Sequence, residues 1–361
     1  MPVPLFDTKS PLAPLRAQID ARIAAVVDRG AFILGSEVAA FETEFAAYVG
    51  ARHAIGVANG TDALTLALRA LGVGPGDDVV VPSFTFYASA EAIPPTGARP
   101  VFCDVDPDTF CVTAETVRRA LTPRTKAVIA VHLFGNVAPV AEIAALGVPV
   151  VEDAAQAAGS RSPAGRPGAL GAIATFSFFP SKNLGAFGDG GAVTTHDDQL
   201  AETVRMLRFH GSRDKTTFEL VGHNSRLDEL QAAILRVQLP HLDDWSERRR
   251  AAGAGYEAAG LGELAALPAP VDGAEPAWHL YVIRHEHADA LAAALGEAGI
   301  GHKAYYRVPA HRQPAMREWA AGAELPATEE VAGTHLAIPM SPALTREQVD
   351  EVVAAVRAFS A

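Results

Sequence analysis

The stretch Phe176-Ser-Phe-Phe-Pro-Ser-Lys-Asn-Leu-Gly-Ala-Phe-Gly-Asp-Gly-Gly191 contains a single lysine, Lys182, where an apolar run turns glycine-rich. The apolar residues before the lysine predict a buried strand, and the glycines after it predict tightly turning backbone. A primary amine held at the end of a buried strand is well placed to form a Schiff base with an aldehyde cofactor. We therefore predict that Lys182 carries pyridoxal 5'-phosphate.

The composition is that of an ordinary globular chain. Of the 361 residues, 49% are hydrophobic and 20% are charged, enough to build one large or two modest domains. No apolar run approaches the roughly 18 residues that span a bilayer, and the N-terminal residues lack the pattern of a signal peptide. We therefore expect a cytoplasmic protein with no membrane partner, and no motif leads us to expect a metal site.

The formal net charge of −12 argues against a general nucleic-acid surface, because phosphate backbones require clustered Lys and Arg. An anionic small-molecule substrate would therefore have to meet a local basic group.

Helical and strand patterns alternate from about residue 15 to residue 240, which predicts an α/β fold with a mostly parallel sheet flanked by helices. Apolar residues three and four apart indicate the helices, and short β-branched runs indicate the strands. The expected helices are 61–71, 113–121 and 138–146, and the expected strands are 79–81, 100–103, 127–131 and 148–151.

The pattern changes after a helix expected at 226–239, which should end before Pro240. The charged stretch 243–250 is expected to be a connector. Beyond it, a strand at 278–283 and a helix at 288–298 indicate a smaller α+β domain. We therefore predict a large cofactor-binding α/β domain at 1–250, including an N-terminal arm, and a small domain at 251–361.

The strand at 148–151 leads into two acids, in the sequence Val150-Val-Glu-Asp-Ala-Ala-Gln156. A carboxylate at a strand end can pair with a pyridine nitrogen and keep it protonated, which makes the ring an electron sink. Asp153 suits that role. Its other interpretation is a helix N-cap.

The segment Val57-Ala-Asn-Gly-Thr-Asp-Ala-Leu64 predicts a helix opened by Gly60 and Thr61, whose amides and hydroxyl could bind a phosphate. A capped helix start without any ligand is the alternative. The presence of Lys182 and Asp153 in the same chain favours the phosphate site. Phe86, which follows a strand, could stack on a planar cofactor or belong to the core. The glycines at 188–191 lack the GxGxxG spacing of a dinucleotide loop.

Four stretches in this order and spacing resemble the DegT/DnrJ/EryC1/StrS family of sugar aminotransferases, which belong to fold type I of the pyridoxal-phosphate enzymes. Any one match would be weak evidence, but four in order are highly specific. They are Asn59-Gly-Thr-Asp-Ala-Leu64, Glu152-Asp-Ala-Ala-Gln156, Ser177-Phe-Phe-Pro-Ser-Lys182 and Gly222-His-Asn-Ser-Arg-Leu-Asp-Glu-Leu-Gln-Ala-Ala233.

The resemblance implies a role for each of the cofactor-site residues. Lys182 would be the Schiff-base lysine, and Asp153 would hold the pyridinium nitrogen. Gln156 would lie near the ring hydroxyl of the cofactor. Thr61 and Ser177 would contact its phosphate.

The resemblance also implies a homodimer with shared active sites. Asn224 would reach the cofactor phosphate of the neighbouring subunit. His223 stands where the family usually has Tyr.

By the same resemblance, glutamate would donate an amino group to a keto nucleotide sugar in amino-sugar biosynthesis. Asp189, in Gly-Asp-Gly-Gly, resembles members that act on 3-keto sugars, whereas members acting at carbon 4 more often carry Glu-Gly-Gly. Phe179, Ser181 and Tyr305 depart from the 3-keto pattern, so amination at carbon 4 stays open as an alternative.

The segment Gly301-His-Lys-Ala-Tyr-Tyr-Arg-Val-Pro-Ala-His311 supplies aromatic and basic groups for a sugar diphosphate. The candidates for substrate contact, together with Phe179, are Lys303, Tyr305, Tyr306, Arg307 and His311. The alternative is a surface loop whose basic residues are merely solvated.

Two rival functions remain for this fold. A related class of pyridoxal-phosphate sugar dehydratases has His in place of the lysine, so Lys182 argues against it. A non-catalytic regulator would need an added DNA-binding or effector module, for which the chain offers no basic helical segment.

Overall fold

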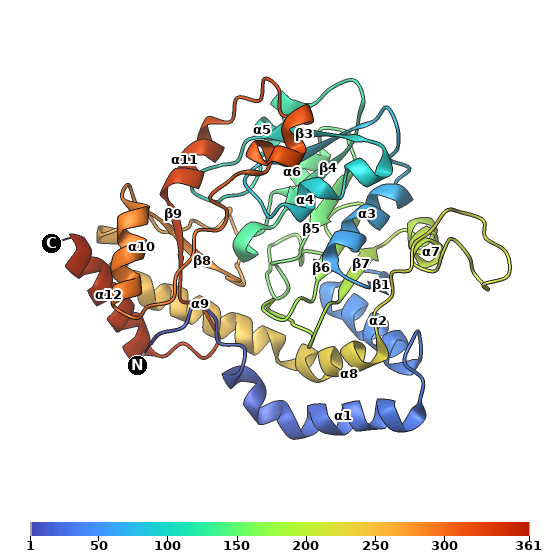
Figure 1. Cartoon of the computed structure of the whole chain (residues 1–361), viewed down its shortest axis with the longest axis horizontal. Helices are drawn as coiled ribbons and strands as arrows, with labels where there is room; N and C mark the ends of the chain where they lie inside the picture. The colour runs from blue at the N-terminus through green and yellow to red at the C-terminus, as the bar shows by residue number, and fades with distance from the viewer. Residues whose placement is uncertain (1, 361) are drawn as a thin grey trace.

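The computed structural model describes residues 2–360. Within that range, seven strands form a central sheet and two strands form a small second sheet (Figure 1). The strands of the central sheet are β1 (His53–Val57), β2 (Asp78–Pro82), β3 (Arg99–Cys103), β4 (Thr125–Val131), β5 (Val150–Asp153), β6 (Ile173–Ser177) and β7 (Gly191–Thr195). The second sheet contains β8 (Tyr281–Arg284) and β9 (His335–Ile338).

The central sheet has the order β1-β7-β6-β5-β4-β2-β3. β7 is antiparallel to both of its neighbours, and the remaining pairs are parallel. β1 therefore runs in the same direction as β6. The carboxyl ends of six strands meet at one edge of the sheet, which is where α/β proteins bind their ligands. The predicted α/β class with a mostly parallel sheet is confirmed.

Twelve α-helices lie within residues 2–360, and α3 packs across β5, β6 and β7. α1 and α2 both contact α8, and Figure 1 shows α1 running beside it. No helix in this range is long and apolar enough to cross a membrane. The helices are α1 (Arg16–Arg29), α2 (Ser36–Val49), α3 (Gly60–Ala70), α4 (Ala88–Glu91), α5 (Ala114–Ala120), α6 (Val140–Ala144), α7 (Asp198–Leu207), α8 (Glu229–Gln238), α9 (Leu242–Ala258), α10 (Ala288–Glu297), α11 (Pro326–Thr334) and α12 (Arg346–Ser360).

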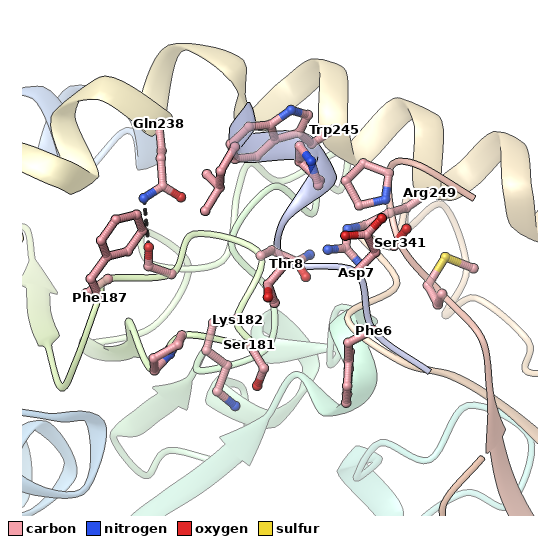
Figure 2. Close-up of a pocket in the computed structure, with 18 residues that line it drawn as sticks. Phe6, Asp7, Thr8, Ser181, Lys182, Phe187, Gln238, Trp245, Arg249 and Ser341 are labelled. Atoms are coloured by element: carbon pink, nitrogen blue, oxygen red, sulfur yellow. Dashed lines mark hydrogen bonds between the residues drawn. The ribbon is translucent and has the colours of Figure 1, made fainter. Parts of the chain in front are cut away.

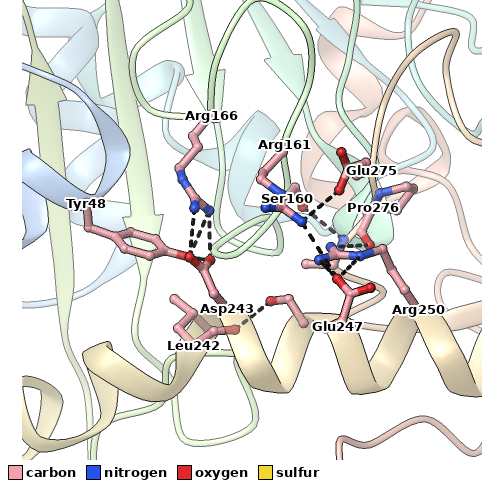
Figure 3. Close-up of polar contacts among 12 residues, drawn as sticks. Tyr48, Ser160, Arg161, Arg166, Leu242, Asp243, Glu247, Arg250, Glu275 and Pro276 are labelled. Atoms are coloured by element: carbon pink, nitrogen blue, oxygen red, sulfur yellow. Dashed lines mark hydrogen bonds and ion pairs between the residues drawn. The ribbon is translucent and has the colours of Figure 1, made fainter.

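The connector predicted at 243–250 is wrong, because these residues belong to α9. Pro240 lies in a single 3-10 turn, η4 (Leu239–His241), and the chain resumes a helix directly after it. Proline is tolerated near a helix start, and the acids Asp243 and Asp244 in the first turn favour the helix N-terminus. Arg166 anchors this end through a bidentate ion pair with Asp243 at 2.9 and 3.0 Å, which Tyr48 joins (Figure 3).

The two ends of α9 pack in different hydrophobic clusters. Leu242 lies among apolar residues of the central sheet and α2, whereas Tyr256 packs with β8, β9 and α12. The boundary predicted after residue 250 therefore falls inside one helix, and the division into domains stays a prediction. The N-terminal segment also joins the C-terminal cluster, because Val3 forms a bridge with Ile300.

A buried carboxylate from α8 caps the start of α2. Glu229 is fully buried and accepts hydrogen bonds from the backbone N–H groups of Gly35, Glu37 and Val38 at 2.8 to 3.0 Å. These are the amides that a helix N-terminus leaves without partners. The contact ties α2 to the segment that precedes it and to α8.

Replacing Glu229 with Ala should lower the free energy of unfolding by about 2–4 kcal/mol, because three buried donors would lose their acceptor. Urea unfolding followed by circular dichroism measures the loss. Glu297→Ala, at an exposed position near the end of α10, is the control and should change stability by less than about 0.5 kcal/mol. Equal losses in both variants would contradict the capping role.

Candidate active site

Lys182 lies in a tight turn that follows β6. Its backbone N–H donates to the Phe179 carbonyl at 2.8 Å, and the Ala186 N–H donates to the Phe178 carbonyl at 2.7 Å. A Cβ on Gly185 would lie 2.6 Å from the Pro180 carbonyl oxygen, so the turn requires glycine there. Burial of the amine lowers the pKa of Lys182 to about 8, and the nearby charge of Asp153 only partly opposes this shift.

Lys182 lines a cavity of about 690 Å³ at the carboxyl edge of the central sheet. The cavity collects chain segments from the ends of β1, β2, β4, β5 and β6. The residues predicted from the sequence that line it are Gly60, Thr61, Phe86, Asp153, Gln156, Ser177, Phe179, Ser181, Lys182, Asp189, Tyr305 and Tyr306.

A second, smaller cavity of about 340 Å³ lies against the same turn. It is enclosed by the N-terminal segment, the loop around Lys182 and the helices α8 and α9 (Figure 2). In Figure 2 the Lys182 amine points away from Trp245 and Gln238, which line the opposite wall. The reactive end of Lys182 therefore belongs to the larger cavity.

Asp153 is the last residue of β5, and its side chain is 5% exposed. Its carboxylate accepts a hydrogen bond from the Ser89 hydroxyl at 2.7 Å and one from the Ala155 N–H at 3.2 Å. The parallel register pairs Asp153 with Thr175 of β6, so the strand order brings Asp153 near the turn that carries Lys182. No residue of the chain forms a salt bridge with this buried carboxylate in the described range.

Gln156 is fixed between two segments. Its side-chain oxygen accepts from the Phe134 N–H at 2.7 Å, and its amide group donates to the Tyr306 hydroxyl at 3.1 Å. The Tyr306 ring lies 5.7 Å from the ring of Phe86, measured between centroids, so two aromatic rings line one side of the cavity.

The start of α3 reaches the cavity through Gly60 and Thr61. The first intrahelical bond comes from Ala63, which leaves the N–H groups of these two residues available. A Cβ on Gly60 would lie 2.8 Å from the Cβ of Ser177, so glycine is needed where the helix start meets the end of β6. The amides and the Thr61 and Ser177 hydroxyls together suit a phosphate.

Two basic residues of the 301–311 segment, Arg307 and His311, do not line the cavity. The Arg307 guanidinium donates to the carbonyls of Ala332 and Gly333 at 2.8 Å. His311 is buried between the Ser83 hydroxyl at 2.6 Å and the Glu329 carboxylate at 2.9 Å. Internal partners therefore bind polar atoms of Arg307 and His311 in this structure, and contact of these two residues with a substrate stays a prediction.

Lys303 and Asn224 also lie outside the cavity. The Lys303 amine sits 5.1 Å from the centre of the Tyr305 ring, on an exposed side chain at the edge of the site. Asn224 is exposed and forms a bridge with Phe209 in the segment after α7.

Several lining residues carried no signal in the sequence pattern, chiefly Phe6, Ser89 and His279. His279 stacks on Phe6 at 5.9 Å between ring centroids. Burial lowers the pKa of His279 well below its usual value, and the charges of Lys182 and Arg249 add to the shift, so the imidazole is neutral. Long-range packing of the N-terminal segment brings Phe6 here, and no local motif indicates it.

Comparison with known proteins decides the family. The model of the DegT/DnrJ/EryC1/StrS aminotransferase family matches residues 14–357. The chain belongs to this family. It is a pyridoxal-phosphate-dependent aminotransferase, as its resemblance implied.

The relatives cover the chain almost from end to end. A dTDP-3-amino-3,4,6-trideoxy-alpha-D-glucose transaminase of Streptomyces venezuelae is 47% identical over 99% of this chain and 96% of its own length. A UDP-N-acetyl-3-dehydro-alpha-D-glucosamine 3-aminotransferase of Acidithiobacillus ferrooxidans is 44% identical over 98% and 97%. The crystal structure of S. venezuelae DesV in complex with a ketimine intermediate matches with a TM-score of 0.96 and 46% identity, over 99% and 98% of the two chains.

Replacing Asp153 with Asn should lower the pKa of Lys182 below about 8, because the carboxylate charge favours the ammonium form. The pH dependence of Lys182 modification by an amine-reactive reagent, followed by peptide mass spectrometry on cofactor-free protein, measures this. Asp189→Asn, in the same cavity, is the matched control and should leave the midpoint in place. A midpoint that moves only in the control would show that a different carboxylate acts on the lysine.

Proposed function

We propose that this aminotransferase moves an amino group from glutamate to carbon 3 of a keto nucleotide sugar. The observation that carries the proposal is the meeting of Lys182, Asp153 and the start of α3 in one cavity of about 690 Å³. The names of the two relatives, both transaminases of 3-amino nucleotide sugars, support the choice of carbon 3.

The residues around the cavity fit pyridoxal phosphate. The amides of Gly60 and Thr61, with the Ser177 hydroxyl, would hold the phosphate. Because Gly60 has no side chain, the helix start can lie close to Ser177. Asp153 would face the ring nitrogen. Phe86 would cover one face of the ring.

When bound, the cofactor supplies a carbonyl carbon that accepts the amino group and a ring that withdraws electrons from the neighbouring carbon. The Lys182 amine first holds the cofactor and then, once displaced, takes the α-proton of the amino donor at Nζ. A pKa of about 8 leaves part of the amine neutral near pH 7, as a base requires. In the second half-reaction, Nζ returns a proton to the sugar carbon that has received nitrogen.

Gln156 and Tyr306 position the rest of the site. The Gln156 side chain spans Phe134 and Tyr306, so the wall contributed by the C-terminal part is bonded to the central sheet. Phe179, Tyr305 and Tyr306 line the cavity and would face the sugar, where their rings exclude water from the proton transfers.

The test of the reaction is a panel of 3-keto and 4-keto nucleotide sugars incubated with glutamate. We expect amination of the 3-keto compounds, identified by mass spectrometry and by NMR of the product. Lys182→Ala serves as the blank and should lose at least about 10³-fold in turnover, because the base and the anchor are the same residue. Amination confined to 4-keto sugars would overturn the choice of carbon 3 and leave the enzyme class intact.

We further propose that the active enzyme is a homodimer with shared sites. Lys182 is the only Lys or Arg among the described residues that line the larger cavity, whereas Asp62, Glu91, Asp153 and Asp189 are acidic. A nucleoside diphosphate would therefore find its cationic partners outside the lining of this cavity, and we propose that a second copy of the chain supplies part of them. The exposed Asn224, which forms a bridge with Phe209 just after α7, is the residue we assign to the second copy's phosphate site. The cytoplasmic location stays a prediction.

Complementation tests the shared site. Asn224→Ala and Lys182→Ala homodimers should each be nearly inactive, but mixing them under conditions that exchange subunits should restore activity. Random exchange leaves roughly a quarter of the sites with both native residues, so about that fraction of wild-type activity is expected. Activity that does not recover after subunit exchange, confirmed by native mass spectrometry, would mean that Asn224 does not act across the interface.

A further inference from the structure

Two hydroxyl groups form a short chain behind the Asp153 carboxylate. The Ser89 hydroxyl lies 2.7 Å from Asp153 Oδ2, and the Thr85 hydroxyl lies 3.0 Å from the Ser89 oxygen. All three side chains are at most 5% exposed. Thr85 lies in the loop after β2, and Ser89 lies in α4, so this chain links the ends of β2 and β5.

The proton positions follow from the chemistry of the groups. An ionised carboxylate only accepts hydrogen bonds, so Ser89 must donate its single hydroxyl proton to Asp153. The Ser89 oxygen then acts as the acceptor for Thr85, whose hydroxyl must be the donor. The hydrogen bonds therefore run in one direction, from Thr85 through Ser89 to Asp153.

Both carboxylate oxygens are held. Oδ2 accepts from Ser89, and Oδ1 accepts from the Ala155 N–H at 3.2 Å, so the plane of the carboxylate is fixed relative to β5. Each oxygen keeps lone-pair capacity toward the cavity, which Asp153 lines. A hydroxyl that donates to an anion forms a charge-assisted bond, which is roughly twice as strong as a neutral one.

We propose that Ser89, supported by Thr85, is a positioning residue that fixes the orientation of the Asp153 carboxylate and so aims its free lone pairs at the ring nitrogen of the bound cofactor. A carboxylate held in this orientation would stabilise the proton on the ring nitrogen, and the protonated ring would withdraw electrons more strongly. This inference rests on the proposed role of Asp153. It assigns to the Ser89 and Thr85 hydroxyls the task of holding the carboxylate in line with the ring nitrogen.

The test uses protein loaded with cofactor that is ¹⁵N-labelled at the ring nitrogen. In Ser89→Ala, Asp153 Oδ2 loses the hydroxyl that holds it in place, so the carboxylate can turn away from the ring nitrogen, and the ¹⁵N signal should move toward the unprotonated value. The rate of α-proton removal in a single glutamate half-reaction should fall about 10-fold, with little change in the KM for glutamate. Ser89→Thr, which keeps the hydroxyl, should restore both readings.

Ser246→Ala is the matched control. Ser246 is fully buried, and its hydroxyl donates to the Leu242 carbonyl at 2.8 Å, inside α9 and outside the cavity. It therefore loses a comparable buried hydrogen bond without touching Asp153, and both readings should stay at wild-type values. If Ser89→Ala does not fold, Thr85→Val replaces it in the test, because it removes the hydroxyl that donates to Ser89. A smaller ¹⁵N shift in the same direction is then expected.

A wild-type ¹⁵N signal and rate in folded Ser89→Ala, or an equal change in the Ser246 control, would overturn the positioning role. Failure of the proposed function gives a different result. In that case the wild-type protein would itself show no amine transfer from glutamate to any keto sugar in the panel. Wild-type transfer together with an unchanged Ser89→Ala variant would remove only this inference.

Discussion

Lys182 and Asp153 place an amine and a carboxylate in one cavity, and the site depends on keeping these two groups close to each other. Burial favours the neutral amine, while the carboxylate favours the ammonium form, and the balance leaves the pKa of Lys182 at about 8. The sheet maintains this proximity. Asp153 ends β5, Lys182 follows β6, and the two strands pair in parallel register.

The same edge of the sheet gathers the other polar groups. β1 leads into Gly60 and Thr61, and β2 leads into the loop with Thr85 and Phe86. Because the carboxyl ends of parallel strands meet at one edge, residues as far apart in the sequence as Thr61 and Lys182 converge without any long loop. The antiparallel β7 allows β1 to join this arrangement in the required direction.

The remaining wall comes from the N-terminal segment and from the C-terminal part of the chain. The bridge between Val3 and Ile300 holds the N-terminal segment so that Phe6 lies in the wall. Tyr306 comes from the C-terminal part, and its hydroxyl accepts a hydrogen bond from the Gln156 amide. α9 joins the two parts as one continuous helix, with its first turn anchored by Arg166 (Figure 3). Closure of the cavity therefore depends on how the two parts pack together.

The sequence by itself determined the chemistry of the site. Lys182, Asp153 and Thr61 each stand in a local pattern, a strand end or a helix start, whose geometry follows from neighbouring residues. Local pattern also indicated β2 to β5 and a helix that ends before Pro240. It read the charged stretch 243–250 as a connector, whereas a new helix, α9, begins at Leu242. Only the tertiary structure decided that Ser89 and Phe6 reach the cavity and that Arg307 and His311 turn to internal partners. Those outcomes depend on strand order and long-range packing, which bring together residues that no short stretch of sequence connects.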